Sequence, residues 1–220
     1  MKIFATSDMH GNRTIINKLA DAARHCDLLL VCGDIGNKEI RDRTFEEFSV
    51  HQLKDAEYLA GLIENLPVPG RFILGNDDWF EFSGPGYLNA PETIGGHEFI
   101  PFEFVLITPF NTNREVNENK LRYELNKLNA GEKSIIVAHT PPFFCGDKIY
   151  SGERVGSRAV YSWVELTQPR LWLCGHIHED NSVHQIGRTY VFNCACNHFE
   201  NTLCGWLIDP DTLEYEKVCF

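Results

Sequence analysis

Residues 27–34 read Asp27-Leu-Leu-Leu-Val-Cys-Gly-Asp34, an apolar run that ends at a glycine and a carboxylate. Such a nearly continuous run is typical of a strand that is buried on both faces of a sheet. Residues 2–6 and 71–74 are shorter runs of the same kind. Between these runs, apolar residues recur at helical spacing over residues 12–24 and 44–66. Strands that alternate with helices predict a parallel sheet with right-handed crossovers.

After residue 80 the predicted elements no longer alternate regularly. Residues 97–108 predict paired strands around Pro101, and residues 118–128 predict a helix. Residues 134–138 and 170–174 predict two further strands, separated by a helix that Ser157 could cap and that runs to Leu166. Two hairpins are expected last, with strands at 183–186 and 189–192 and at 202–209 and 213–219. No linker or repeat interrupts the pattern, so we expect residues 1–220 to form one domain.

The composition is that of a globular protein with an acidic surface. Of the 220 residues, 43% are hydrophobic and 23% are charged, and the formal net charge is −11. This charge argues against non-specific binding to long nucleic acid, although bound metal could still attract a small phosphate ester. No run approaches the roughly 18 apolar residues of a membrane span, and the N-terminus soon turns polar, unlike a signal peptide. We therefore expect a cytoplasmic protein that does not contact membranes.

The eight cysteines are expected to be free thiols. Most of them belong to apolar, strand-like runs, as Cys32 and Cys174 do. A free cysteine in such a run behaves as a small buried apolar residue, and free thiols are typical of a reducing cytosol. Cys194 and Cys196 are too close in sequence for a usual zinc site. Neither disulfides nor a zinc–thiolate site is therefore predicted.

Five short polar motifs stand where predicted strands end and loops begin. In open α/β sheets, ligands bind beyond the carboxyl ends of the strands, so these side chains are expected to meet at one rim. The motifs are Asp8-Met-His10, Gly33-Asp34, Gly75-Asn76-Asp77-Asp78, His139 and Gly175-His176-Ile-His178.

The motifs offer two Asp, one Asn and four His as ligands, which is enough for two adjacent divalent cations. Two cations roughly 3.5–4 Å apart are a standard device for cleaving phosphate esters. Mixed nitrogen and oxygen donors without thiolate suit manganese, iron, zinc, cobalt or nickel, and disfavour copper or an iron–sulfur cluster. The histidines could instead be satisfied core residues, but four of them at strand ends argue against this alternative.

With its motifs in this order, the chain resembles the calcineurin-like metallophosphoesterase superfamily from Asp8 to His178 and onward to the C-terminal strands. The segments His139-Thr-Pro-Pro, Gly146-Asp147, Val155-Gly156-Ser157 and Cys174-Gly-His-Ile-His178 are similar to those of the small brain-type metallophosphoesterase-domain proteins and their microbial relatives. The resemblance implies an α/β (α+β) fold, a four-layer αββα sandwich of two mixed β-sheets flanked by helices. The implied ligands are Asp8, His10 and His178 for the first metal and Asn76, His139 and His176 for the second, with Asp34 bridging both.

The activity implied by the resemblance is dinuclear-metal-dependent hydrolysis of a phosphoester. We expect a phosphodiesterase that acts on a small nucleotide-like or other phosphodiester. A metal-activated hydroxide would attack phosphorus directly, so no covalent enzyme intermediate is needed. The residues expected to take part in catalysis are Asp77 and two of the implied ligands, Asn76 and His10.

Asp77 departs from the family pattern, because many members have a histidine there that touches the phosphate or assists the leaving group. An ionised Asp77 would repel phosphate, whereas a protonated Asp77 could donate a proton if burial and nearby carboxylates raise its pKa. We therefore expect substrates with good leaving groups to be hydrolysed best. Asp78 is expected to orient a ligand from behind.

Four residues outside the ligand set are candidate substrate contacts. Arg154 and Arg158 could bind a substrate phosphate or form a solvated surface pair. Phe143 could stack on a base or pack within its loop. His198 follows a predicted strand and could line the pocket or lie on the surface.

Three other functions are compatible with the same scaffold. A metal-poor protein-interaction scaffold is the first, and the complete ligand set argues against it. A nuclease acting on DNA ends is the second, and the acidic charge and the absence of an added DNA-binding segment argue against it. A protein phosphatase is the third, but its larger family members carry extra arginine motifs that are not found in this sequence.

Overall fold

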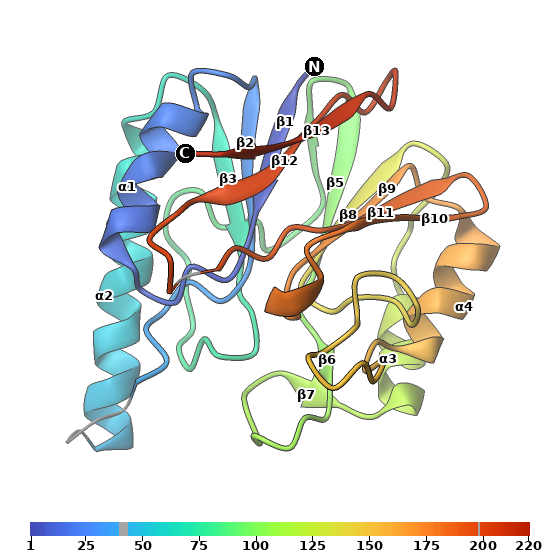
Figure 1. Cartoon of the computed structure of the whole chain (residues 1–220), viewed down its shortest axis with the longest axis horizontal. Helices are drawn as coiled ribbons and strands as arrows, with labels where there is room; N and C mark the ends of the chain where they lie inside the picture. Colours follow the sequence, from blue (N-terminus) through green and yellow to red (C-terminus); the bar gives the residue numbers. More distant parts are fainter. Residues whose placement is uncertain (40–43, 198) are drawn as a thin grey trace.

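The computed structural model describes residues 1–39, 44–197 and 199–220. Two sheets pack face to face, and helices cover their outer faces (Figure 1). The predicted four-layer sandwich of two mixed sheets flanked by helices is thereby confirmed. Within the described ranges, no helix combines the length and the apolar character that crossing a membrane requires.

The first sheet joins the N-terminal strands to the C-terminal ones. Its strands are β1 (Ile3–Thr6), β2 (Leu28–Cys32), β3 (Gly70–Ile73), β12 (Cys204–Ile208) and β13 (Tyr215–Cys219). They lie in the order β13-β12-β1-β2-β3. β1, β2 and β3 are parallel, with α1 (Arg13–Ala22) and α2 (Phe45–Glu64) between them in sequence, as predicted. β12 is antiparallel to β1 and to β13.

The second sheet is built from the middle of the chain. Its strands are β4 (Glu92–Ile94), β5 (His97–Phe102), β8 (Ser134–Ala138), β9 (Leu171–Cys174), β10 (Val183–Ile186) and β11 (Thr189–Asn193). They lie in the order β10-β11-β9-β8-β5-β4, parallel in the centre with antiparallel strands at both edges. The short strands β6 (Val105–Leu106) and β7 (Glu115–Val116) pair separately. The helices of this half are α3 (Glu118–Leu125) and α4 (Arg158–Thr167).

Side-chain alternation along the strands creates three apolar layers. In β1, Ile3 points into the core between the sheets, whereas Phe4 points to the core under α1 and α2. In β8, Ile135 faces the inter-sheet core and Ile136 faces the core under α3 and α4. Because both faces of these strands are covered, the strands themselves read as continuous apolar runs. Polar side chains can then emerge only at the strand ends.

One predicted hairpin was wrong. Residues 97–108 do not pair around Pro101; β5 runs through Pro101 and pairs with β4, which turns back at Gly95 and Gly96. Both glycines have positive φ angles of 58° and 86°, which suits a tight hairpin turn. The last β4 partner on β5 is Phe99, opposite Glu92, so Pro101 lies beyond the paired part of β4. A proline is tolerated there because that side of the strand needs no N–H donor.

The prediction that all cysteines are free was also wrong. Cys204 and Cys219 lie opposite each other on the antiparallel strands β12 and β13 and form a disulfide. The two cysteines are 15 residues apart in sequence, and only the register of the hairpin places them opposite each other. The other six cysteines are free and buried, as expected.

Candidate metal centre

The five motifs meet at the seam between the two sheets. Asp8, Asp34 and Asn76 follow β1, β2 and β3 of the first sheet, and His139 and His176 follow β8 and β9 of the second. The carboxyl ends of parallel strands share one edge of a sheet, so each sheet delivers its polar residues to the same side. Packing the two sheets face to face then brings both sets together.

The backbone at these strand ends adopts conformations that non-glycine residues seldom take. The φ angles of Asp8, His10, Asp34 and His176 are 63°, 43°, 53° and 75°. Such left-handed conformations cost about 1–3 kcal/mol each and cluster at functional sites. Gly75 leaves room for this arrangement, because a Cβ atom on it would overlap the carboxylate and amide of Asp34.

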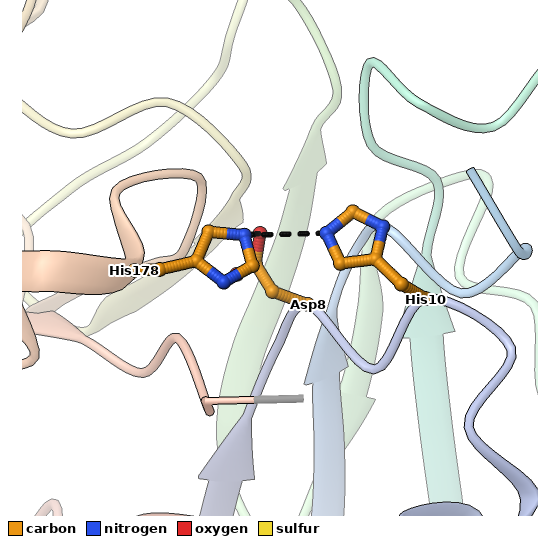
Figure 2. Close-up of side chains that lie close together, drawn as sticks. All are labelled: Asp8, His10 and His178. Atoms are coloured by element: carbon orange, nitrogen blue, oxygen red, sulfur yellow. Dashed lines mark hydrogen bonds and ion pairs between the residues drawn. The ribbon is translucent and has the colours of Figure 1, made fainter. Parts of the chain in front are cut away.

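Asp8, His10 and His178 form the first group of side chains. Nε2 of His10 lies 3.2 Å from Nε2 of His178, and Nε2 of His178 lies 3.4 Å from Oδ1 of Asp8. Figure 2 shows His10 and His178 pointing toward one another from different segments, with Asp8 beside His178. The imidazole rings of His10 and His178 are stacked, with an interplanar angle of 10° and centroids 5.1 Å apart. Each residue offers a ligand atom, and the three atoms lie within 4.8 Å of one another.

Asp34 and His139 link this group to the second sheet. Oδ2 of Asp34 lies 3.3 Å from Nε2 of His139 and 3.8 Å from Nε2 of His10. Nδ1 of His139 donates a hydrogen bond of 2.7 Å to the carbonyl oxygen of Cys32. That bond leaves Nε2 facing the site, which is the arrangement a metal-ligating histidine needs. Asp34 therefore lies between histidines that come from both sheets.

His176 and Asn76 complete the set. The amide of His176 donates to both carboxylate oxygens of Asp8, at 3.2 and 3.0 Å, and its ring centroid lies 5.2 Å from that of His139. The amide of Asp77, next to Asn76, donates to Oδ1 of Asp34 at 2.9 Å. Nδ2 of Asn76 donates to Thr112, whereas Oδ1 is buried and has no hydrogen-bond partner in the described part of the chain.

Burial and mutual charge set the protonation of these histidines. Burial lowers the pKa of His10 to about 3 and, together with the charge of His139, lowers the pKa of His176 to about 4. Burial also lowers the pKa of His139, but Asp34 and Asp8 outweigh it and raise that pKa to about 10. His10 and His176 are therefore neutral at pH 7, which is the form that binds metal. A cation would compete with the proton on His139.

The two candidate ligand carboxylates, Asp8 and Asp34, are stabilised in their ionised form. Burial raises the pKa of Asp8, but His178 outweighs this effect, so the pKa is well below its usual range. Burial acts in the same direction on Asp34, and His139 outweighs it, so the pKa of Asp34 is also low. Both groups carry negative charge at neutral pH, in a site where each is almost fully buried.

Asp77 and Asp78 have different positions. Oδ2 of Asp77 lies 3.9 Å from Nδ1 of His10, and its side chain is 24% exposed, so it stands at the mouth of the site. Burial and the charge of Asp34 raise its pKa to about 7. Asp78 is fully buried and accepts hydrogen bonds from the amides of Ile35, Gly36 and Gly75. It thus joins the second motif to the third, and its expected role of orienting a ligand stays a prediction.

The candidate substrate contacts Phe143, Arg154 and Arg158 lie in the segment that runs from His139 to the first residue of α4, and each contacts a neighbour in that segment. Arg154 donates to the buried carboxylate of Asp147 at 2.6 Å, and the guanidinium of Arg158 lies 3.9 Å from the centroid of the Phe143 ring. Within the described ranges, neither arginine forms a hydrogen bond or an ion pair with the five motifs, so their roles toward substrate stay predictions. His198 lies outside the described residues.

Residues 112–115, which no sequence motif indicated, contact the third motif. The amide of Asn113 donates to the carbonyl oxygen of Asn76 at 2.9 Å, and Arg114 donates to the carbonyl oxygens of Gly75 and Asp78. The stretch Thr-Asn-Arg-Glu follows β6 and ends at the first residue of the two-residue strand β7, and it has no periodicity or motif spacing, so nothing in the sequence marked it. We call residues 112–115 the clasp.

Lys38 is a second residue that the motifs did not indicate. Burial and the neighbouring carboxylates have the larger effects, but the positive charge of Lys38 also acts to lower the pKa of His10, Asp77 and His178. Its ammonium group lies 5.5 Å from the centroid of the Phe199 ring. Lys38 is exposed, so it adds positive charge at the surface next to the buried histidines.

The donor set fits a pair of divalent cations. Asp8, Asp34 and His139 form a second group whose ligand atoms lie within 4.8 Å of one another, and it shares Asp8 with the first group. The amide oxygen of Asn76 is an acceptor to which no residue of the described ranges donates a hydrogen bond. These oxygen and imidazole donors, with no cysteine among them, suit divalent cations of intermediate hardness.

The sequence profile of calcineurin-like phosphoesterases matches residues 1–180. An uncharacterized protein of Methanocaldococcus jannaschii is 28% identical over 207 residues, which make up 88% of this chain and 87% of the relative.

Two solved structures share the fold at low sequence identity. A dimetal phosphatase from Danio rerio superposes with a TM-score of 0.56 at 12% identity, covering 99% of this chain and 91% of the other. An archaeal phosphodiesterase superposes with a TM-score of 0.51 at 13% identity, covering 100% of both chains. At such identities the likeness concerns the arrangement of the layers and not the substrate.

Proposed function

Because the chain belongs to the calcineurin-like phosphoesterase family, we propose that it hydrolyses a small phosphodiester with two divalent cations bound at the strand ends. Membership makes the chain a metal-dependent phosphoesterase; the choice of a diester, nucleotide-like or other, is the proposal. The observation that supports a centre with two cations is the position of Asp34, whose Oδ2 lies within 3.8 Å of histidines from both sheets. A carboxylate in that position can bridge two cations.

The proposed ligands divide between the two cations. Asp8, His10 and His178 would hold the first, since their ligand atoms already lie within 4.8 Å of one another. The second would be held by the three remaining ligands, with Asp34 shared. This set consists of Asn76, His139 and His176. The proposed cations are two of manganese, iron, zinc, cobalt or nickel, because the donors suit all of these.

When bound, the cations supply Lewis acidity toward the phosphate and a water of lowered pKa. The protein's own residues do the rest. Asp8 and Asp34 return two negative charges, so the site keeps an excess of positive charge that attracts a phosphate group. Lys38 adds a positive charge nearby, whereas Asp77 places a carboxyl at the mouth, where it could hold a proton for the departing oxygen. Arg154, Arg158 and Phe143 remain the proposed contacts to the rest of the substrate.

One property of the chain favours a small substrate over a polymer. Its formal net charge of −11 opposes binding along a nucleic-acid backbone. The archaeal structural neighbour is described as a phosphodiesterase, whereas the Danio rerio one is described as a phosphatase. A substrate panel must therefore separate diesters from monoesters.

The test is reconstitution of the metal-stripped protein with single metals. Mn²⁺, Zn²⁺, Ni²⁺ and Fe²⁺ are added back one at a time, and each sample is assayed on a nitrophenyl monoester, a bis-nitrophenyl diester, cyclic nucleotides and single-stranded DNA. Diester turnover restored by at least one metal is the expected result. Exclusive turnover of the monoester or of DNA would contradict the diester proposal and identify a phosphatase or a nuclease. Inactivity with every metal would favour a protein-interaction scaffold.

We also propose that residues 1–220 act as one domain. The family match ends at residue 180, yet β12 pairs with β1 in the centre of the first sheet. A cytoplasmic location stays a proposal: six free buried cysteines favour it, and the Cys204–Cys219 disulfide argues against it. Fractionation of cells that produce the protein would decide the location.

A further inference from the structure

The amide of Asn76 can face the metal centre in two ways, and only one of them is productive. Its oxygen can bind a cation, whereas its NH₂ group can only donate hydrogen bonds. The two orientations have nearly the same shape, so packing alone discriminates poorly between them. Something must therefore hold the NH₂ group away from the centre. In this chain the partner of that group is Thr112, a residue of the clasp, at 2.7 Å.

The hydroxyl of Thr112 is committed as a donor elsewhere. It lies 2.5 Å from Oε1 of Glu115 and donates its single hydrogen to that oxygen. A hydroxyl whose single hydrogen is already donated in one hydrogen bond can only accept hydrogen bonds from its other neighbours. It can therefore accept from the NH₂ group of Asn76 but cannot donate to the oxygen of Asn76.

Glu115 is in turn held as an acceptor. Oε1 receives the backbone amide of Thr112 at 2.8 Å and Oε2 receives that of Thr108 at 3.1 Å, and a backbone N–H can only donate. The hydroxyl of Thr108 donates to Oε1 as well. Burial raises the pKa of Glu115, but these hydrogen bonds outweigh it and hold the pKa below its usual range. Both oxygens of Glu115 thus accept, and neither can reverse the bond to Thr112.

The backbone of the third motif is fixed separately. The backbone amide of Asn113 donates a hydrogen bond to the carbonyl oxygen of Asn76. The guanidinium of Arg114 donates to the carbonyl oxygens of Gly75, Asp78 and Phe80. None of these bonds depends on which way the side-chain amide of Asn76 is turned. The chain of side-chain bonds can therefore be removed while the loop keeps its other supports.

We propose that Glu115 and Thr112 are positioning residues, which orient the amide of Asn76 so that its oxygen faces the metal centre. The direction of donation runs from Asn76 to Thr112 to Glu115, and this polarity leaves the buried Oδ1 atom of Asn76 without a hydrogen-bond partner among the residues that the structure describes. The inference rests on the proposed function, because it assumes that Asn76 binds a cation.

The experiment measures metal binding by the whole protein, independently of activity. Metal-stripped protein is titrated with MnCl₂ in a calorimeter, and folding is checked by urea unfolding. Thr112→Val keeps the shape but removes the hydroxyl, and we expect one of the two Mn²⁺ sites to weaken by about 10–100-fold, the usual cost of losing a partner outside the ligand set. Thr112→Ser restores the hydroxyl and should restore that site.

Thr108→Val is the matched control. It removes a second hydroxyl bond to the same carboxylate oxygen but does not touch Asn76, so both Mn²⁺ sites should keep their affinities even if the protein becomes less stable. Should Thr112→Val fail to fold, Glu115→Gln takes its place. A Gln offers one acceptor oxygen where the structure needs two, so we expect this variant to weaken the same Mn²⁺ site, and unchanged affinity would contradict the positioning role.

The outcomes separate this inference from the proposed function. If the unaltered protein takes up no Mn²⁺ and no other divalent cation, both are overturned. If it binds two ions and Thr112→Val binds them equally well, the positioning role is overturned while the proposed function stands. If Thr108→Val weakens a site as much as Thr112→Val does, the effect is loss of loop structure and the positioning role is again overturned.

Discussion

Oδ2 of Asp34 lies 3.3 Å from Nε2 of His139, so a carboxylate at the end of β2 touches an imidazole at the end of β8. The two strands belong to different sheets. The contact therefore exists only because the sheets pack face to face with their carboxyl ends on the same side. A metal pair at this seam would be held by the packing of the whole sandwich and not by any single loop.

Asp34→Asn should remove activity while leaving the fold intact, because the amide keeps the shape but not the charge needed to bridge two cations. We expect kcat/KM to fall by more than about 100-fold, since the loss of a group outside the ligand set alone costs up to that factor. Metal analysis should show fewer than two ions per chain. Asp21→Asn, which alters an exposed ion pair with Arg24, is the control and should have no effect. Full metal content in Asp34→Asn would contradict the bridging role.

Removal of metal should destabilise the protein. A ligand at 100 times its dissociation constant stabilises the folded state by about 2.7 kcal/mol. For a chain of this size, that corresponds to about 5–10 °C in Tm. Thermal unfolding followed by circular dichroism with EDTA, and then with excess MnCl₂, measures the difference. Identical melting curves would mean that no tight site for Mn²⁺ exists.

Asp77→Asn should discriminate between leaving groups. If Asp77 delivers a proton to the departing oxygen, its loss should slow a diester with an alkyl alcohol leaving group by about 100-fold, the lower end of general acid catalysis. Turnover of a bis-nitrophenyl diester should change much less, because nitrophenolate leaves without protonation. Steady-state rates on both substrates provide the comparison. Equal rates for wild type and Asp77→Asn on the alkyl diester would remove Asp77 from the mechanism.

The ion pair between Arg71 on β3 and Glu92 on β4 should make stability depend on pH. Both oxygens of Glu92 accept from the guanidinium, at 2.7 and 2.6 Å. The hydrogen bond from Arg71 lowers the pKa of Glu92 in the folded state. The contribution of this ion pair to the free energy of unfolding is therefore fully present above the pKa of Glu92 in the unfolded chain, about 4.3. It is lost as pH falls through the lowered pKa of Glu92 in the folded state.

Glu92 is 38% exposed, so solvent screens the pair and we expect Glu92→Gln to cost about 0.5–1 kcal/mol at pH 7. Urea unfolding of wild type and Glu92→Gln at pH 7 and at pH 3 measures this difference. The gap between them should shrink at pH 3. A gap that grows on acidification would show that the pair does not stabilise the fold in this way.

The Cys204–Cys219 disulfide predicts a thiol count. Protein unfolded without reductant should react with six equivalents of a thiol reagent, matching the six free cysteines, and with eight after reduction. Eight equivalents before reduction would show that the two strands carry free thiols in the isolated protein.

Elements whose cause is local could be predicted. Asp27–Cys32 is apolar throughout because both faces of β2 are covered, and the strand appears at Leu28–Cys32. Asn12 and Thr44 cap the helices that follow them, and such caps depend on residues two or three positions away. The candidate ligands could be proposed for the same reason, since each of their five motifs comes shortly after the end of a strand.

Features that depend on which strands become neighbours could not be predicted. The path of β5 through Pro101 follows from the short length of β4, and the Cys204–Cys219 bond follows from the register of β12 against β13. The hydrogen bond from Arg154 to Asp147 likewise depends on a loop fold that no periodicity encodes.

The order of motifs along the chain was therefore enough to indicate the family, the strand ends and the polar donors. Only the packed molecule placed Asp34 against His139 and brought Thr112 and Glu115 behind Asn76. Hydrophobic periodicity reports which face of an element is buried, because burial acts on each residue separately. Hydrophobic periodicity does not indicate which distant element covers that face. The contacts around the metal centre depend on which elements pack together.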